Sequence, residues 1–336
     1  MFHFSGLFKK VNLDFSRKLP GDIEADICGM KNEEFMSNRK AYIITGPTSG
    51  IGRATAFELA KHGTVILVGR NPGKIDEVRH SIEQKGQHAV SVVCDLSDVG
   101  SARRAAAEII ALRLPIAGLL NNAGISPMSK AENAQGWDLT FATNYLGPFA
   151  LTEALTPHLP DRTNVVFIAS AVEDPERKPA KVLGMRGGRY ISAEASARGE
   201  WKQGGCKLPG ADAYATSKQC LLAASMAFVR ENPRLRFNAV EPGITPGTGL
   251  SRDANIVLRF LFGRVLTLFP PFARYRSTPT RAARLITKVL VDESGANGIY
   301  YDEKGRSMLG SELVRDPRFQ DRVVAETRVL LSTVQV

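Results

Sequence analysis

The sequence predicts a doubly wound α/β fold, in which two layers of helices enclose a mostly parallel sheet. From Lys40 onward, short apolar runs alternate with amphipathic helical segments. A glycine-rich turn separates the first apolar run from the first helical segment. No linker divides the chain into two cores, and 336 residues suit one large α/β domain. Strands that alternate with helices imply right-handed crossovers, a parallel sheet and helices on both faces.

The elements can be placed in order from the apolar pattern. Gly63 and Gly86 end the first two helices, and Pro72 stands near the start of the second. The seven expected strands are residues 41–45, 64–69, 89–94, 116–124, 164–170, 235–242 and 298–301. The expected helices are residues 51–63, 71–86, 98–112 and 136–157, one around residues 214–218, one beginning at Pro279 and one at residues 316–331.

Residues 1–39 differ from the rest of the chain. They carry mixed charge and little periodicity, so we expect an N-terminal extension followed by one nucleotide-binding domain at residues 40–336. The opening residues lack a sustained apolar core and a cleavage site, so no secretory signal is expected. Four cysteines lie far apart without a CxxC pair, which argues against a zinc site or a disulfide framework. These features favour a reducing, cytoplasmic compartment.

The charge balance is basic and uneven. A net charge of +10 arises from 44 basic and 34 acidic residues, and residues 251–284 hold seven arginines with one acid. Such an excess suits an anionic partner, which could be a nucleotide phosphate or a membrane surface, or it serves solubility. No nucleic-acid module is recognisable, so nucleic acid is not expected as a partner.

The turn TGPTSGIG follows the first expected strand and opens the first expected helix. Gly46 can make the tight turn, Gly50 permits close approach of a phosphate, and Gly52 permits close packing of helix on strand. The helix N-terminus then offers free N–H groups to a pyrophosphate, so the turn predicts a dinucleotide site. The residues expected to contact the dinucleotide at this turn are Thr45, Gly46, Thr48, Ser49, Gly50, Ile51 and Gly52.

The second expected strand ends in Gly69 and Arg70. NAD-binding folds usually place an acid at this point for the ribose 2′-hydroxyl, whereas an arginine can bind a 2′-phosphate. NADP(H) is therefore preferred over NAD(H), unless Arg70 is only a solvated loop residue. Asp95 and Leu96 follow the third strand as further cofactor contacts, although Asp95 could instead cap the next helix.

These motifs together resemble the short-chain dehydrogenase/reductase family. Its TGxxxGxG motif is similar to TGPTSGIG, and its NNAG motif is similar to residues 121–124. The resemblance runs in order from about Lys40 to the C-terminus and implies a Rossmann fold that oxidises or reduces a carbonyl or alcohol with NAD(P)(H). It assigns further cofactor contacts to Asn122, Ala123, Gly124, Pro242, Gly243 and Thr248.

The resemblance also implies a catalytic set made of Asn144, Ser170, Tyr214 and Lys218. Tyr214 would exchange a proton with the substrate oxygen, and Lys218, one helical turn later, would lower its pKa and bind the nicotinamide ribose. Ser170 would bind the substrate oxygen, and Asn144 would hold a water that links Lys218 to solvent. A homo-oligomer through the helices of Asn144 and Tyr214 is a further implication.

Two regions depart from the family pattern. Ser170 and Tyr214 are 44 positions apart, and the insertion at residues 171–210 resembles those of retinol-dehydrogenase-like members and protochlorophyllide reductases. It either forms an active-site rim, with Tyr190 and Trp201 near substrate, or elaborates the surface. Residues 246–278 are very apolar and fit a lid over a lipophilic substrate. A peripheral membrane contact through residues 254–276, a buried helix and a dimer contact are the other readings.

The leading hypothesis is an NADP(H)-dependent oxidoreductase of a lipophilic carbonyl or alcohol. A non-catalytic NADPH-binding regulator on the same fold is one alternative, since fold does not fix function. A double-bond reductase of the protochlorophyllide-reductase type is another.

Overall fold

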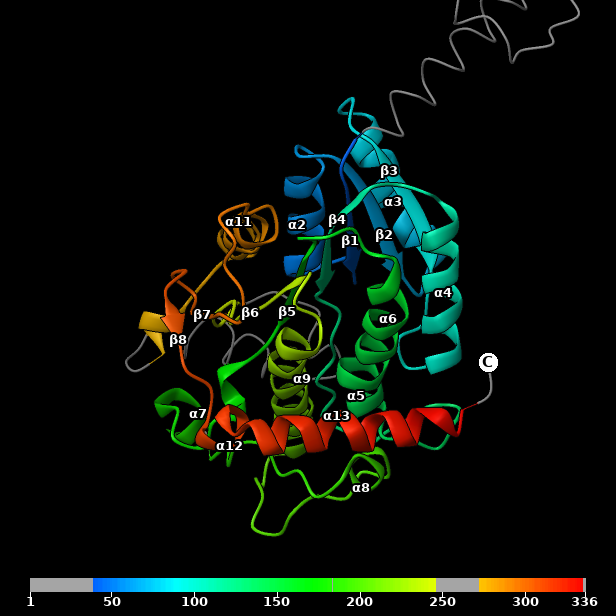
Figure 1. Cartoon of the computed structure of the whole chain (residues 1–336). Coiled ribbons are helices and arrows are strands. Elements are labelled where there is room, and N and C mark those ends of the chain that lie inside the picture. The colour runs from blue at the N-terminus through cyan, green and yellow to red at the C-terminus, as the bar shows by residue number, and fades with distance from the viewer. Residues whose placement is uncertain (1–38, 183, 246–271, 335–336) are drawn as a thin grey trace, which may run out of the picture. The chain divides into compact units, whose positions relative to one another are not determined.

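The computed structural model describes residues 39–182, 184–245 and 272–334. Apart from Arg39, these residues belong to one unit, Lys40–Val336. Helices and strands are labelled as in Figure 1.

One sheet organises this unit. Its strand order is β3-β2-β1-β4-β5-β6-β7-β8, and all neighbours are parallel except β7 and β8. Seven strands lie where the sequence predicts them, but the described residues form eight, so the seven-stranded expectation is corrected. The eighth, β8, has only two residues, too few to show an apolar pattern. The strands are β1 (Ala41–Thr45), β2 (Thr64–Gly69), β3 (Ala89–Val93), β4 (Ile116–Asn121), β5 (Asn164–Ile168), β6 (Arg236–Val240), β7 (Tyr300–Tyr301) and β8 (Ser307–Met308).

Helices cover both faces of the sheet (Figure 1). Neighbouring residues of β1 face opposite layers, because Ile43 belongs to one apolar cluster and Ile44 to the other. This explains why the central strands are uniformly apolar rather than alternating. One layer contains α2 (Gly50–Leu59), α3 (Pro72–Glu83) and α11 (Pro279–Leu290). The other contains α4 (Val99–Ala111), α6 (Gly147–Leu155) and α9 (Ala211–Glu231).

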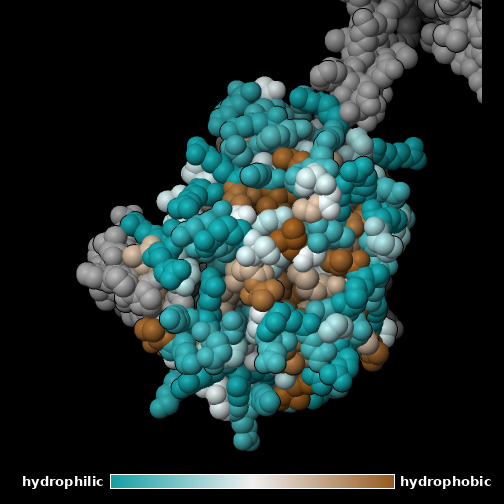
Figure 2. All heavy atoms as spheres, turned by 60° about the vertical axis from the view of Figure 1, so that its left-hand side comes forward, coloured by the Kyte–Doolittle hydropathy of each residue, from teal (hydrophilic) through white to brown (hydrophobic). Residues whose placement is uncertain are grey.

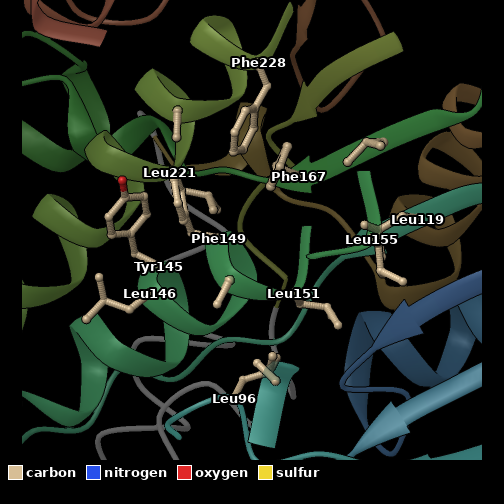
Figure 3. Close-up of a cluster of buried hydrophobic side chains, with 14 of the residues drawn as sticks. Leu96, Leu119, Tyr145, Leu146, Phe149, Leu151, Leu155, Phe167, Leu221 and Phe228 are labelled. Atoms are coloured by element: carbon tan, nitrogen blue, oxygen red, sulfur yellow. The ribbon is translucent and has the colours of Figure 1, made fainter. Parts of the chain in front are cut away.

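Aromatic and leucine side chains fill the layer around α6 and α9 (Figure 3). Phe149 lies between Tyr145 and Phe228, with ring centroids 5.8 and 5.3 Å away. Phe228 in turn contacts Phe237 of β6 at 5.5 Å. This chain of tilted rings ties the helices to the sheet and fixes the position of α9 relative to β6.

The long helix expected at residues 136–157 is interrupted. It consists of α5 (Leu139–Phe141), a π-helical turn η1 (Ala142–Leu146), α6 and a 3₁₀ turn η2 (Thr156–His158). Asp138 caps its start by accepting a hydrogen bond from the main-chain N–H of Phe141 at 2.8 Å. Apolar periodicity cannot distinguish an α-helical from a π-helical turn of this length, so the interruption was missed.

The insertion at residues 171–210 contains three short helices. They are η3 (Ala171–Glu173), α7 (Lys178–Val182) and α8 (Ala193–Ala197). Tyr190 is buried and donates a hydrogen bond to Glu326 at 2.6 Å, while Trp201 packs edge-on against Phe141. Both aromatic residues therefore serve the core in this structure rather than lining an open site.

The remaining helices are η7 (Ala273–Tyr275), α12 (Glu312–Arg315) and α13 (Pro317–Ser332), and α13 runs across α9 (Figure 1). Its Arg328 pairs with Glu153 of α6 at 2.6 Å and with Glu231 of α9 at 2.7 Å. Most side chains of α9 are buried, as are those of η1 and α6. A homo-oligomer through these helices stays a prediction, and they leave little exposed surface for it.

The face of the molecule that Figure 2 presents is mostly hydrophilic. On the face that Figure 2 presents, hydrophobic side chains gather in the middle and hydrophilic ones surround them. No helix among the described residues is long and apolar enough to cross a membrane.

Candidate functional site

The glycine turn lies between β1 and the first turn of α2. Gly46 and Gly50 have φ values of +68° and +52°, a conformation that favours glycine. A Cβ on Gly52 would lie 2.1 Å from the main-chain oxygen of Gly46, so only glycine lets the helix close on the turn. Thr48, Ser49 and Ile51 are partly exposed along the same turn. The main chain is thus shaped as a pyrophosphate site requires.

Thr45 fastens this turn to the end of β4. Its hydroxyl is fully buried and accepts hydrogen bonds from the main-chain N–H groups of Asn122 and Ala123, at 2.9 and 3.0 Å. The Asn122 side chain donates back to the main-chain oxygen of Thr45 at 2.8 Å. Thr45 therefore positions the cofactor site, while its direct contact with a dinucleotide stays a prediction.

The end of β2 presents Arg70 to solvent. Among residues 39–182, 184–245 and 272–334, no side chain pairs with its guanidinium, which leaves it accessible to an anion. A Cβ on Gly69 would meet Ile75 at an ordinary contact distance of 3.4 Å, so glycine is not required there by space.

Asp95 does not cap the helix that follows it. Its carboxylate accepts hydrogen bonds from the main-chain N–H and the hydroxyl of Ser97, at 2.9 and 2.7 Å. Asp98 caps α4 instead, through the N–H of Gly100 at 2.9 Å. Of the two readings of Asp95, helix capping is thus wrong and a cofactor contact stays a prediction. Leu96 is buried beside Gly147 and packs in the core.

Asn144 lies in the π-helical turn and is fully buried. Its side chain accepts from the N–H of Ile125 at 2.8 Å and donates to the oxygen of the same residue at 2.9 Å. It also donates to the hydroxyl of Ser217 at 3.2 Å. A Cβ on Gly124 would lie 3.3 Å from Asn144 and 3.7 Å from the ammonium of Lys218. The NNAG segment therefore closes directly over both residues.

Tyr214 and Lys218 occupy successive turns of α9 and face the end of β5. The Lys218 ammonium lies 5.7 Å from the centre of the Tyr214 ring and donates to the main-chain oxygen of Ile168 at 2.7 Å. Tyr214 hydrogen-bonds through its side chain with Ser170, two residues beyond Ile168. The structure therefore brings Asn144, Ser170, Tyr214 and Lys218 into one site.

Burial dominates the titration of this pair. It lowers the pKa of Lys218 to about 8, and the charge of Glu241 acts in the opposite direction. Burial also raises the pKa of Tyr214, as does Glu241, while the hydrogen bond with Ser170 lowers it. Lys218 was expected to lower the pKa of Tyr214. The protein residues without a cofactor raise that pKa instead.

The Pro-Gly segment follows β6. Gly243 has φ of +76°, and a Cβ there would lie 2.7 Å from the main-chain oxygen of Tyr275. Pro242 is partly exposed beside it. Thr248, and most of the apolar segment at residues 246–278, lie outside the described residues.

Sequence reasoning missed two members of this site. Ile125, which binds the Asn144 side chain through its main chain, gives no signal because any residue can do so. Glu241 is a buried carboxylate whose only sequence signal is its place between an apolar strand and Pro242. Taken together, the turn, the helix N-terminus and the titratable pair can hold a dinucleotide and move a proton beside it.

Comparisons with known proteins agree with this geometry. The short chain dehydrogenase family model matches residues 40–178. Polyprenol dehydrogenase of Mus musculus is 30% identical over 299 residues, which cover 84% of this chain and 81% of that protein. Chloroplastic protochlorophyllide reductase of Pisum sativum is 28% identical over 297 residues, covering 82% and 66% respectively.

A solved structure adds a cofactor to the comparison. A protein described as a short chain dehydrogenase from Shigella flexneri, complexed with NADP, aligns with a TM-score of 0.56 and 25% identity. The alignment covers 80% of this chain and 98% of that one. From its fold, its converging motif residues and these relatives, the chain belongs to the short-chain dehydrogenase/reductase family of NAD(P)-dependent oxidoreductases.

Proposed function

We propose that the chain is an NADP(H)-dependent oxidoreductase that interconverts an alcohol and a carbonyl on a lipophilic small molecule. The observation that carries the proposal is the convergence of Ser170, Tyr214 and Lys218 beneath the NNAG segment. When bound, the cofactor supplies or accepts the hydride and, in its oxidised form, adds positive charge to the site.

Tyr214 is the proposed proton donor in reduction and acceptor in oxidation. It is partly exposed, so a substrate oxygen can reach it, and Ser170 already shares a hydrogen bond with its side chain. Ser170 would hold the substrate oxygen and stabilise negative charge on it. Lys218, with a pKa lowered to about 8, can exchange protons near neutral pH and pass them toward Tyr214.

Asn144 would serve the proton path through its main chain. Its side chain is already committed to Ile125 and Ser217, so a water would have to bind the main-chain oxygen. A π-helical turn disturbs the normal main-chain pairing, and such turns are frequent at functional sites. This assignment replaces the less specific expectation that Asn144 holds a water.

NADP(H) is proposed as the preferred cofactor because Arg70 is exposed, and pairs with no side chain in the described part of the chain, where a 2′-phosphate would lie. The absence of an acid at Gly69 supports the same preference. The Shigella flexneri relative solved with NADP is consistent with it.

A lipophilic substrate is supported by the apolar sequence of residues 246–278 and by the relatives. Polyprenol and protochlorophyllide, which are named in the relatives' descriptions, are both largely apolar molecules. We propose that residues 246–278 cover such a substrate and that the insertion contributes to the rim. Contact with a membrane surface through residues 254–276 is a further proposal.

The test is a panel of polyprenols, retinoids, steroids and fatty aldehydes, followed at the NADPH absorbance band. We expect turnover of at least one class, and a loss of roughly 100- to 10,000-fold in Tyr214→Phe. Tyr145→Phe is a matched control, because Tyr145 is buried and bound to Thr327 away from the site. If the protein binds NADPH but turns over no compound of the panel, a non-catalytic NADPH-binding regulator is favoured. Full activity of Tyr214→Phe would refute the assignment of Tyr214 to proton transfer.

A second candidate is reduction of a carbon–carbon double bond, which the protochlorophyllide reductase relative favours. That activity would need a bound pigment. Visible absorbance of the purified protein, and light-dependent turnover, would distinguish it from the leading proposal.

A further inference from the structure

Glu241 is a buried carboxylate at the end of β6, directly before Pro242. One of its oxygens accepts a hydrogen bond from the main-chain N–H of Ala171, and the other accepts from Gly243 at 3.1 Å. Both oxygens thus act as acceptors, which is the role of an ionised carboxylate. A buried charge costs free energy unless hydrogen bonds or an ion pair stabilise it, and here the N–H groups of Ala171 and Gly243 do so.

The two bonds join separate parts of the site. Ala171 follows Ser170 directly, so the carboxylate fixes the main-chain direction at the residue that shares a hydrogen bond with Tyr214. Gly243 belongs to the Pro-Gly segment, which is expected to contact the cofactor. Glu241 therefore holds the ends of two neighbouring strands in a fixed relation at their carboxyl edge.

The charge of Glu241 reaches the proton-transfer pair. Lys218 donates to the main-chain oxygen of Ile168, whose partner on β6 is Val240, the residue directly before Glu241. The charge of Glu241 raises the pKa of both Tyr214 and Lys218. Arg177, in the segment after η3, also faces the Glu241 carboxylate. Tyr300 of β7 and Glu303, which follows β7, face it from the other side of the sequence. Of these groups, Glu241 is the one whose charge favours the ammonium form of Lys218.

We propose that Glu241 is a positioning residue, which orients Ser170 through Ala171 and keeps Lys218 protonated. The inference deepens the proposed function and rests on it. Without the carboxylate, Lys218 would lose its ammonium at lower pH, and the phenolate of Tyr214 would form at lower pH.

Glu241→Gln tests this with little change in size. Glutamine has one acceptor oxygen, so one of the two N–H groups is left facing an amide N–H. Glu173→Gln is the matched control, because Glu173 is equally buried and binds Ser311 with both oxygens, and its charge is not among those acting on Lys218.

The first readout needs no substrate. Lysine side chains carrying ¹³C at Cε are titrated by NMR, and the Lys218 signal is assigned by its loss in Lys218→Met. We expect the Lys218 midpoint, about 8 in the natural sequence, to fall in Glu241→Gln and to stay in Glu173→Gln. An unchanged midpoint in Glu241→Gln, or an equal fall in both variants, would overturn the charge assignment.

The second readout is the pH profile of kcat/KM in the oxidation direction. In Glu241→Gln we expect a loss of roughly 10- to 100-fold and an acid limb displaced to lower pH. Glu241→Asp keeps the carboxylate charge but has a shorter side chain, which would no longer reach both N–H groups. This variant should therefore lose activity, while the midpoint of its Lys218 titration stays near 8. A midpoint that falls in Glu241→Asp as far as in Glu241→Gln would contradict the proposal, as would full activity of both. If the natural sequence turns over no substrate, the proposed function fails, and the Lys218 midpoint still decides the role of Glu241.

Discussion

The two halves of the sheet differ in the polar side chains that they bury. Between Lys40 and Gly124, all of which the structure describes, the buried polar side chains are neutral threonines, a serine and an asparagine. In the later half, the buried polar set includes seven ionisable residues, namely Asp138, Glu173, Lys218, Arg236, Glu241, Asp302 and Glu303.

This difference matches the role proposed for each half. A dinucleotide cradle has to keep its shape at any pH, and neutral hydroxyl and amide groups such as Thr45 and Asn122 do that without a titration. A proton-transfer site needs groups whose pKa is moved toward the working range, and burial does that to Lys218. Burial also moves the pKa of Glu173, in the same half but outside the site. We therefore expect substitutions in the first half to change the free energy of unfolding by the same amount at every pH. Substitutions of the ionisable residues in the second half should have effects that depend on pH.

The largest effect is expected for Lys218→Met. Activity should fall roughly 100- to 10,000-fold, because the proton path loses its exchangeable group. The variant should nevertheless be more stable at pH 7, since an ammonium with a pKa lowered to about 8 no longer has to be buried.

The sign of its pH dependence follows from linkage. Between about pH 8 and 10.5 the unfolded chain holds the Lys218 proton more tightly, so the natural protein gains stability as pH rises, and Lys218→Met does not. Urea unfolding at pH 7 and pH 9 measures this. Lys61→Met, at an exposed site, is the control and should change little at either pH. The prediction would be contradicted if Lys218→Met were less stable than the natural protein and its free energy of unfolding rose between pH 7 and pH 9 as much as that of the natural protein.

Thr45→Val tests the neutral half. It leaves the N–H groups of Asn122 and Ala123 without their acceptor, so we expect a loss of about 2 to 4 kcal/mol in the free energy of unfolding. The loss should be equal at pH 5.5 and pH 8. Thr55→Val is a matched control, because its hydroxyl only bonds back to Ile51 within α2. A loss that varies with pH would break the comparison between the halves.

Glu173→Gln tests the ionisable half. Burial raises the pKa of Glu173 to about 7, above its ordinary 4.5, so its stabilisation is present below about pH 4.5 and lost as pH rises through 7. The natural protein should therefore lose up to about 3 kcal/mol relative to Glu173→Gln between pH 5 and pH 8. Parallel pH–stability curves for the two proteins would show that Glu173 does not titrate in this window.

Gly69→Asp is expected to have the smallest effect and leave stability nearly unchanged. A Cβ fits at Gly69, and a carboxylate there would repel a 2′-phosphate and accept from a 2′-hydroxyl. We expect the ratio of NADPH to NADH affinity to fall about 10- to 100-fold, measured by fluorescence titration. Arg70→Ala should weaken NADPH without strengthening NADH. An unaltered ratio in both variants would refute the proposed cofactor preference.

The sequence predicted the neutral half of the fold well. Its strands are buried on both faces and read as unbroken apolar runs, and Gly46, Gly50 and Gly52 stand where positive φ or close packing demands glycine. These are local requirements, and a local pattern can show them.

The ionisable half was less predictable because its features depend on distant contacts. The buried carboxylate of Glu173 accepts a hydrogen bond from Ser311, which lies far along the chain. The carboxylate of Glu241 accepts one from the N–H of Ala171. The π-helical turn around Asn144 and the two-residue strand β8 carry no period of their own. For Tyr190 and Trp201 the sequence offers only an active-site rim or a surface elaboration, and their packing in the core depends on contacts with α13 and Phe141 that are distant in sequence.

The crossing of α13 over α9 has a consequence for how the chain reaches its native state. α9 carries Tyr214 and Lys218, yet its outer face is covered by residues 317–332, and Arg103 of α4 binds the main-chain oxygens of Leu331 and Val334 at 2.9 Å. During synthesis, α9 therefore emerges well before the helix that covers it. Until α13 docks, apolar surface on α9 is exposed to neighbouring chains, which favours aggregation during this interval.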